Sequence, residues 1–254
     1  MKKTTTAFLL VCALVTAASG QDSRAARGAK AKAAEAEDAV ERLLDRYMLA
    51  QGGVELFKLR TRVVRGRVEM SESPLPGTFE QYEKVPHMSI MVINLLGGQF
   101  LTGANGDRRW MQTPWGETRT VASVGSADLL RQAASGKGFK WRNAFSAAAL
   151  KGRATVEGRE TVVLAATPRG GEPLLIYFDA ETSLPRKTER VHLAAGSDDQ
   201  VRAVYFDSYA TVDGVKVPAL IRQVTARYTL TFRVTEVKHN VAIDDRLFNS
   251  PEGK

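Results

Sequence analysis

Period-two alternation of apolar and polar side chains is the feature that most constrains the folding of this 254-residue chain. Apolar and charged positions alternate through residues 62–70, and residues 227–234 repeat the pattern near the other end. This period is typical of a strand with one buried and one solvated face. We therefore predict sheet at both ends of the domain. The apolar positions of the two segments include Val64, Val68, Met70, Tyr228, Leu230 and Phe232.

Turn-forming dipeptides divide the chain between these segments into short pieces. Such dipeptides favour tight hairpin turns, which join antiparallel strands. Parallel strands would need helical crossovers, and the pattern does not contain them. We predict an antiparallel meander of about ten strands. The clearest dipeptides are Asn105-Gly106, Glu157-Gly158 and Asp213-Gly214.

One helix is predicted before the first strand. From residue 35, apolar residues recur every three or four positions, among them Val40, Leu44 and Tyr47. Gly52-Gly53 closes this run, as glycines often close helices. The apolar stripe is wide enough to pack on the face of a sheet.

A helical insert is predicted at mid-chain, over residues 126–150. Ser126 can cap a short helix that contains Leu129, and residues 141–150 carry Phe145 with a run of alanines. The expected fold class is α+β. It is a strongly curved, unclosed antiparallel half-barrel whose concave face is covered by the N-terminal helix and the insert.

The first twenty residues have the three parts of a cleavable secretory signal peptide. Lys2 and Lys3 precede an apolar run at residues 7–15, and small residues end at Gly20. The run is too short for a bilayer core, which needs roughly 20 residues. We expect export to the periplasm with cleavage after Gly20. Residues 21–34 would then be a flexible linker, and residues 35–254 a single domain.

Cysteine and charge restrict the chemistry further. The single cysteine, Cys12, lies in the leader, so cleavage would remove thiol chemistry. The alternative is a lipobox that makes Cys12 a lipid-anchored first residue, although Val11 is bulky where a small residue is wanted. Lys and Arg outnumber Asp and Glu by 36 to 28 but are spread along strand positions. This spread favours a solvated surface and no nucleic-acid partner.

Sequence patterns for catalysis and metal binding are missing. His87, His192 and His239 lie far apart, without the spacing of a metal site. Nucleophile-elbow and phosphate-loop motifs do not occur. Asp244-Asp245 is better explained as a helix cap than as an acid–base pair. We expect a protein that is not an enzyme and that needs no metal or cofactor.

Three segments resemble LolA-like proteins, the bacterial outer-membrane lipoprotein-sorting class. Residues 205–218 look like the family's "FDDYR-VDGVKLP" strand-turn-strand, and residues 235–248 are similar to its "TEVKHNVPIDD-KF" ending. Residues 44–53 resemble its "LDKYV-ALGG" helix. The resemblance implies a bent, unclosed barrel in the periplasm. It also implies helices that plug an apolar cavity for acyl chains, without metal or cofactor.

These observations predict a periplasmic protein that holds the acyl chains of a lipid or lipoprotein. An envelope membrane protein is the expected donor or acceptor. Binding would be driven by burial of methylene groups, at about 0.8 kcal/mol each. The predicted cavity residues are inward strand positions and residues of the insert: Val64, Val68, Met70, Ile90, Val92, Trp110, Leu129, Phe145, Tyr228, Leu230 and Phe232.

Two alternatives remain open at this level. A non-catalytic envelope scaffold or stress-sensor domain would use the same sheet with a filled core and bind proteins by an edge or loop. An exported hydrolase would have to bring Ser123, His87 and Asp107 together, a trio supported only by residue type. A cavity favours the carrier, whereas a packed interior favours the scaffold.

Overall fold

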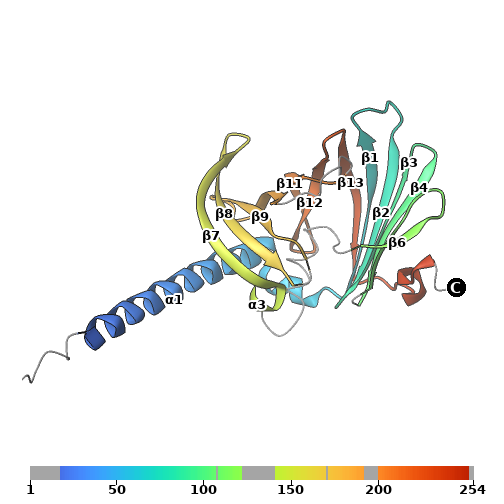
Figure 1. The fold of residues 1–254 in the computed structure, drawn as a ribbon. Coiled ribbons are helices and arrows are strands. Elements are labelled where there is room, and N and C mark those ends of the chain that lie inside the picture. The colour runs from blue at the N-terminus through green and yellow to red at the C-terminus, as the bar shows by residue number, and fades with distance from the viewer. Residues whose placement is uncertain (1–17, 107, 122–140, 170, 192–199, 252–254) are drawn as a thin grey trace, which may run out of the picture. The chain divides into compact units, whose positions relative to one another are not determined.

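The structure, a computed structural model, describes residues 18–106, 108–121, 141–169, 171–191 and 200–251 (Figure 1). Strands make up most of these ranges, as the period-two alternation predicts. In chain order the elements are α1 (Ala18–Gln51), η1 (Gly53–Lys58), β1 (Thr61–Met70), β2 (Gly77–Lys84), β3 (Met88–Leu95), β4 (Gly98–Asn105), β5 (Arg108–Gln112), β6 (Thr118–Thr120), α3 (Trp141–Ala144), β7 (Phe145–Val156), β8 (Arg159–Pro168), β9 (Leu174–Asp179), β10 (Pro185–Arg190), β11 (Ala203–Val212), β12 (Val215–Val224), β13 (Thr229–His239) and η2 (Asp245–Phe248).

Within the described ranges the strands form one 13-stranded sheet in the order β6-β5-β4-β3-β2-β1-β13-β12-β11-β10-β9-β8-β7. All neighbouring strands are antiparallel. β1 pairs with β13, which joins the first and last strands in the middle of the sheet. β6 and β7 are the edges, so the sheet stays open (Figure 1). The predicted unclosed antiparallel fold is confirmed, with 13 strands instead of about ten.

A glycine allows the sheet to bend where β1 meets β13. The pairing register shifts between Arg65 and Gly66, which marks a β-bulge. A Cβ atom at Gly66 would lie 2.1 Å from the carbonyl oxygen of Arg233 and 2.6 Å from the ring of Phe79. Only glycine permits this close approach, and a bulge increases the local bend and twist of its strand. The position of this glycine therefore helps to set the curvature seen in Figure 1.

The predicted flexible linker at residues 21–34 is wrong, because these residues belong to α1. Alanine, lysine and arginine make up most of the segment, and all three are strong helix formers. Intrinsic helix propensity therefore accounts for this part of α1, which has no apolar stripe. The chain divides into two compact units, residues 1–38 and residues 39–254, and α1 runs through the boundary. The predicted signal peptide lies mostly at residues 1–17, outside the described residues.

The predicted mid-chain helices are corrected in part. Residues 122–140, with Ser126 and Leu129, lie outside the described residues. Of the expected helix at residues 141–150, only the single turn α3 is helical, and β7 begins at Phe145. The alanines of this segment pair with β8, from Ala147 opposite Thr167 onward. Strand pairing here overrides the helix propensity of alanine.

The second unit has one large core where residues 39–51 of α1 pack on the sheet. Leu44 is fully buried, and the rings of Tyr47 and Phe178 lie 5.5 Å apart. Each fully buried aliphatic or aromatic side chain contributes about 1.5–3 kcal/mol to folding. We call this group the helix-covered core. Its buried members are Val40, Leu43, Leu44, Tyr47, Met48, Leu56, Trp141, Phe145, Leu164, Ala166, Leu174, Ile176, Phe178, Val215 and Val217.

Candidate functional site

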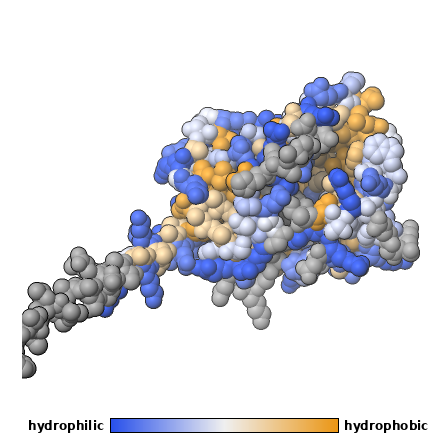
Figure 2. All heavy atoms as spheres, viewed as in Figure 1, coloured by the Kyte–Doolittle hydropathy of each residue, from blue (hydrophilic) through white to orange (hydrophobic). Residues whose placement is uncertain are grey.

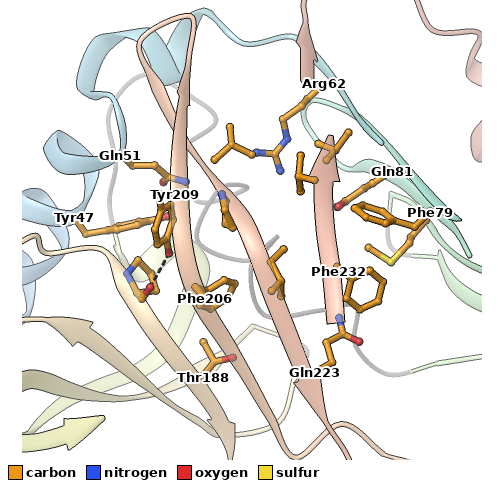
Figure 3. A pocket seen from close by; sticks show the side chains of 17 residues that line it. Tyr47, Gln51, Arg62, Phe79, Gln81, Thr188, Phe206, Tyr209, Gln223 and Phe232 are labelled. Atoms are coloured by element: carbon orange, nitrogen blue, oxygen red, sulfur yellow. Dashed lines mark hydrogen bonds between the residues drawn. The ribbon is translucent and has the colours of Figure 1, made fainter. Parts of the chain in front are cut away.

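A cavity lies on the same face of the sheet, beyond the C-terminal end of α1 (Figure 3). The space in it that can hold the centres of water molecules is about 80 Å³. Small-molecule sites are usually larger, at about 300–1,000 Å³, but they have the same mostly apolar wall with a few polar groups. We call this face of the sheet the inner face. The cavity residues are Tyr47, Gln51, Arg62, Val64, Phe79, Gln81, Met91, Pro185, Thr188, Phe206, Tyr209, Val217, Pro218, Ile221, Gln223, Phe232 and Val234.

Aromatic and branched side chains form the middle of the cavity wall. Phe79 from β2 and Phe232 from β13 meet edge to face, with ring centroids 5.2 Å apart. Phe206, Ile221 and Phe232 lie in register on β11, β12 and β13. Because paired residues of antiparallel strands share one face, these side chains form a continuous apolar row. The wall at this level is suited to hydrocarbon.

Polar residues form one end of the cavity, at the beginning of β1. The Arg62 guanidinium donates two hydrogen bonds to Glu83, at 2.5 and 2.9 Å, and Gln81 donates a third at 2.9 Å. The Glu83 side chain is 1% exposed, and that of Arg62 is 11% exposed. A buried ion pair seldom increases stability over apolar residues of the same size. Its presence next to an apolar cavity therefore points to function.

Two buried acceptors lie at or near this polar end, Gln51 in the cavity wall and His239 behind it, outside the cavity residues. The Gln51 side chain, at the end of α1, reaches the cavity, and its Oε1 atom has no hydrogen-bond partner among the described residues. His239 lies opposite Arg62 in the β1–β13 register, and its Nδ1 atom is 3.0 Å from Asp213. Desolvation by burial lowers the pKa of His239, against the opposing effect of the hydrogen bond that its Nδ1–H donates to Asp213. The imidazole is therefore held in its neutral form, with Nε2 as an acceptor that has no partner in the described structure.

Tyr209 forms a fixed part of the wall beside α1. Its hydroxyl donates a 2.7 Å hydrogen bond to the Pro185 carbonyl oxygen. Burial raises the pKa of Tyr209 well above its ordinary value, so the phenol stays neutral. A neutral, already bonded hydroxyl contributes shape rather than acid–base chemistry. The dashed line in Figure 3 shows this bond.

Two of the eleven cavity residues predicted from sequence lie in the cavity wall, and three more belong to the neighbouring cluster. Val64 and Phe232 line the cavity, and Val68 lies in the same buried cluster with Phe79. Met70 and Leu230 pack against that cluster. Tyr228 lies in the turn between β12 and β13, and Phe145 belongs to the helix-covered core. Leu129 lies outside the described residues.

Three predicted residues, Ile90, Val92 and Trp110, lie elsewhere. Ile90 and Val92 flank Met91, which reaches the cavity, and so they lie on the outer face of the sheet. Trp110 shares that face, because it pairs with Gly103, which pairs with Ile90. Ile90 and Trp110 form a separate buried cluster with Phe248 of η2, against which Val92 packs. The sequence run 88–96 is apolar on both faces because η2 covers the outer one. The prediction that these three residues line the cavity is therefore wrong, because they lie on the opposite face of the sheet.

Sequence reasoning missed most of the polar end, although signals for it exist. Gln51 continues the helical spacing of Leu44 and Tyr47, which places it on the buried stripe of α1. Arg62 precedes Val64 by two residues and therefore shares its face. Counting residues through the β1–β2 hairpin places Glu83 opposite Arg62. The signal for the polar end was a polar or charged residue at a position where the periodicity predicts an apolar one.

The expected absence of catalytic groups concerns residues that are only partly described. Ser123 and Asp107 of the hydrolase alternative, and His192, lie outside the described residues. Asp244 caps η2 by accepting a hydrogen bond from the Arg246 amide, as predicted. In the part of the chain that the structure describes, no group of three or more His, Cys, Asp or Glu residues could hold a metal ion. The same residues contain no helix with the length and apolarity that a membrane span requires.

No family model matches the chain, and no curated protein matches it. Solved structures do match. A DUF1329 family protein from Desulfovibrio piger superposes with a TM-score of 0.55 at 16% identity, over 85% of this chain and 99% of that one. A LolA superfamily protein from Nitrosomonas europaea gives a TM-score of 0.55 at 12% identity, over 84% and 98% of the two chains. This chain has a LolA-like fold.

The LolA-like fold confirms the resemblance predicted from the three sequence segments. At 12% and 16% identity the likeness concerns the fold alone. The bent sheet, the helix packed on its inner face and the adjacent cavity are the parts of this fold that the described residues contain. What the cavity holds has to be argued from its own residues.

Proposed function

We propose that this protein is a periplasmic carrier that holds the acyl chains of a lipid or lipoprotein in its cavity. The observation that carries the proposal is the apolar row of Phe206, Ile221 and Phe232, whose side chains line the cavity. A hydrocarbon chain along this row would bury methylene groups at about 0.8 kcal/mol each. Burial of about ten methylenes would supply about 8 kcal/mol, the size of a micromolar affinity before the cost of association, without a metal or a catalytic group.

Export fits this proposal. Residues 1–20 have the composition of a cleaved signal peptide, so we propose the periplasm as the location. A lipid anchor at Cys12 is the alternative address. Both place the cavity where acyl chains must cross water between membranes.

We also propose an envelope membrane protein as donor or acceptor. Leu75, Leu96 and Trp115 are 63%, 53% and 86% exposed and lie in the turns that follow β1, β3 and β5. These three strands run in one direction, so their turns lie at one end of the sheet. Elsewhere in the face shown in Figure 2, hydrophilic residues are interspersed with smaller apolar patches. Exposed apolar turns suit a transient contact.

Filling the cavity tests the carrier function directly. Val234→Phe adds a ring inside the cavity, whereas Arg233→Phe adds one on the outer face of the same strand. We expect native mass spectrometry of exported protein to show bound lipid in the wild type and in Arg233→Phe. Uptake of a fluorescent acyl probe should follow the same pattern. Val234→Phe should lose both signals while keeping its thermal unfolding transition.

The outcome that contradicts the proposal is equally specific. A wild-type protein that carries no lipid and takes up no probe is not an acyl carrier. Equal uptake by Val234→Phe and the wild type would place the probe outside the cavity. Either result would favour the scaffold or stress-sensor alternative, in which the exposed turns bind protein partners.

A further inference from the structure

The polar end of the cavity contains more hydrogen-bonding capacity than the fold requires. Gln51 is 8% exposed and lines the cavity, yet its Oε1 atom has no hydrogen-bond partner among the described residues. A buried polar atom without a partner is costly, because folding removes its water without replacing the lost hydrogen bond. Such an atom at a cavity wall is expected to be satisfied by what the cavity holds.

The surroundings of Gln51 place it beside the other buried polar groups. A Cβ atom at Gly52, the next residue, would lie 3.0 Å from the carbonyl oxygen of Gly214. Gly214 adjoins Asp213, which contacts His239 at 3.0 Å, and His239 lies opposite Arg62. The Nε2 atom of His239 is a second buried acceptor without a partner in the described structure. His239 is therefore a second unpartnered acceptor, opposite Arg62, although only Gln51 of the two is a cavity residue.

The charge at this end is balanced. Glu83 accepts two hydrogen bonds from Arg62 and one from Gln81, so the positive charge that reaches the cavity already has a carboxylate beside it. A ligand anion would approach Glu83 as well as Arg62, and a ligand cation would approach Arg62 as well as Glu83. A ligand of either charge therefore gains no net electrostatic attraction at this end, and a neutral ligand avoids the cost of burying a charge there.

We infer that the cavity selects acyl ligands with a neutral, hydroxyl-bearing headgroup, such as an acylglycerol, through a hydrogen bond to Gln51. This inference rests on the proposed carrier function and adds the class of headgroup. A hydroxyl suits the site because it both donates and accepts. It can therefore bind the Gln51 amide in either orientation of its oxygen and nitrogen. The chain of the ligand would then extend along the Phe206–Ile221–Phe232 row.

Three ligands with one chain length separate the headgroup from the chain. Monopalmitoylglycerol is neutral with hydroxyl donors, palmitate is an anion, and methyl palmitate is neutral without a donor. We expect each to displace a fluorescent acyl probe from exported protein, with monopalmitoylglycerol tightest. Its advantage over methyl palmitate should be about five- to tenfold, the size of one hydrogen bond to a buried neutral group.

Gln51→Leu is the decisive variant. Leucine keeps the helix and the volume but removes the amide, so monopalmitoylglycerol should fall to the affinity of methyl palmitate, which itself should not change. Gln112→Leu, a matched change on β5 outside the cavity residues, should leave the preference intact. Thermal unfolding of each variant checks that the fold is kept.

The failures can be told apart. If all three ligands bind with one affinity, or if Gln51→Leu keeps the preference for monopalmitoylglycerol, the carrier function stands and the headgroup inference is overturned. Tighter binding of palmitate overturns the inference too, because it would show that Arg62 acts as an anion site. If none of the three ligands binds, the carrier function fails and the inference fails with it.

Discussion

The helix-covered core and the cavity are two regions of one inner face with opposite designs. In the core, residues 39–51 of α1 fill the space over β8 and β9, and Leu44 and Leu164 are both fully buried. In the cavity, the side chains of β1, β2 and β11–β13 face a space that no described side chain fills. Tyr47 belongs to both regions, since it packs on Phe178 and also lines the cavity.

The difference between the two regions follows from where α1 ends. Its apolar stripe stops at Gln51, and Gly52 turns the chain toward β1 with a φ of 148°. The sheet continues past this point, so part of its inner face is left without helix cover from α1. At the boundary the chain places Gln51, Arg62 and Glu83 where an ordinary core would have apolar residues. Packing therefore serves stability in one region, and in the other the wall is available to the proposed ligand.

The largest expected effect is at this polar boundary. Glu83→Leu removes the carboxylate that accepts two hydrogen bonds from Arg62, and the remaining charge is 11% exposed. Removing one partner of a buried pair costs about 3–5 kcal/mol of unfolding free energy. The double variant Arg62→Leu/Glu83→Leu should recover most of this loss. Urea unfolding of the three proteins measures both steps, and a double variant as unstable as Glu83→Leu would contradict the buried-pair argument.

The next effect tests the packing of the helix-covered core. Leu44→Ala should lower the unfolding free energy by about 2–5 kcal/mol, because it leaves a void where no atom of Leu44 is exposed. Leu49→Ala, on the same helix but 73% exposed, should change it by less than about 0.5 kcal/mol. Chemical denaturation gives both values. Similar losses for the two variants would mean that this part of α1 is not docked as described.

One substitution made in both regions compares them directly. Val215→Phe adds a ring in the helix-covered core, where Val215 is fully buried and its Cγ2 atom would be 3.2 Å from a Cβ atom at Gly52. Overpacking of this kind costs about 1–3 kcal/mol. Val234→Phe should cost less, because the cavity has room for the ring. A larger loss for Val234→Phe would show that the cavity is filled in solution.

Sequence periodicity was sufficient for the strands and for the buried stripe of α1. It failed at residues 145–150, because alanine favours helix and nothing local reveals that Ala147–Ala149 pair with β8. It failed again at residues 21–34, where propensity without periodicity produces helix. In both places local preference and tertiary context disagree, and the sequence does not show which one prevails.

The cavity was harder to predict than the sheet, because a cavity depends on which face is covered. Ile90 and Trp110 have the same alternation as true cavity residues, but the cover of η2 places them in an outer cluster. That cover comes from Phe248, more than a hundred residues away in the chain. Arg62 and Gln51 could have been found from their register, once polar residues at apolar positions were treated as site candidates.

The smallest expected effect is the pH dependence at the polar end, from His239. Its pKa is lowered below the ordinary 6.5, first by desolvation and then by the charge of Arg62, against the opposing influence of Asp213 and Glu83. The unfolded chain therefore binds the proton more readily than the folded one. The unfolding free energy should fall as the pH is lowered through 6.5 and level off below the folded pKa.

Two variants isolate this contribution. His239→Asn stays neutral at every pH and should flatten the unfolding profile between pH 7 and 5. Asp213→Asn removes the carboxylate that raises the His239 pKa, so its ring should titrate at a still lower pH in an NMR titration. The helix-covered core supplies the reference, because Leu44→Ala should lower the whole profile without changing its shape. A His239 ring that titrates at or above 6.5 in the wild type would contradict the desolvation of this ring.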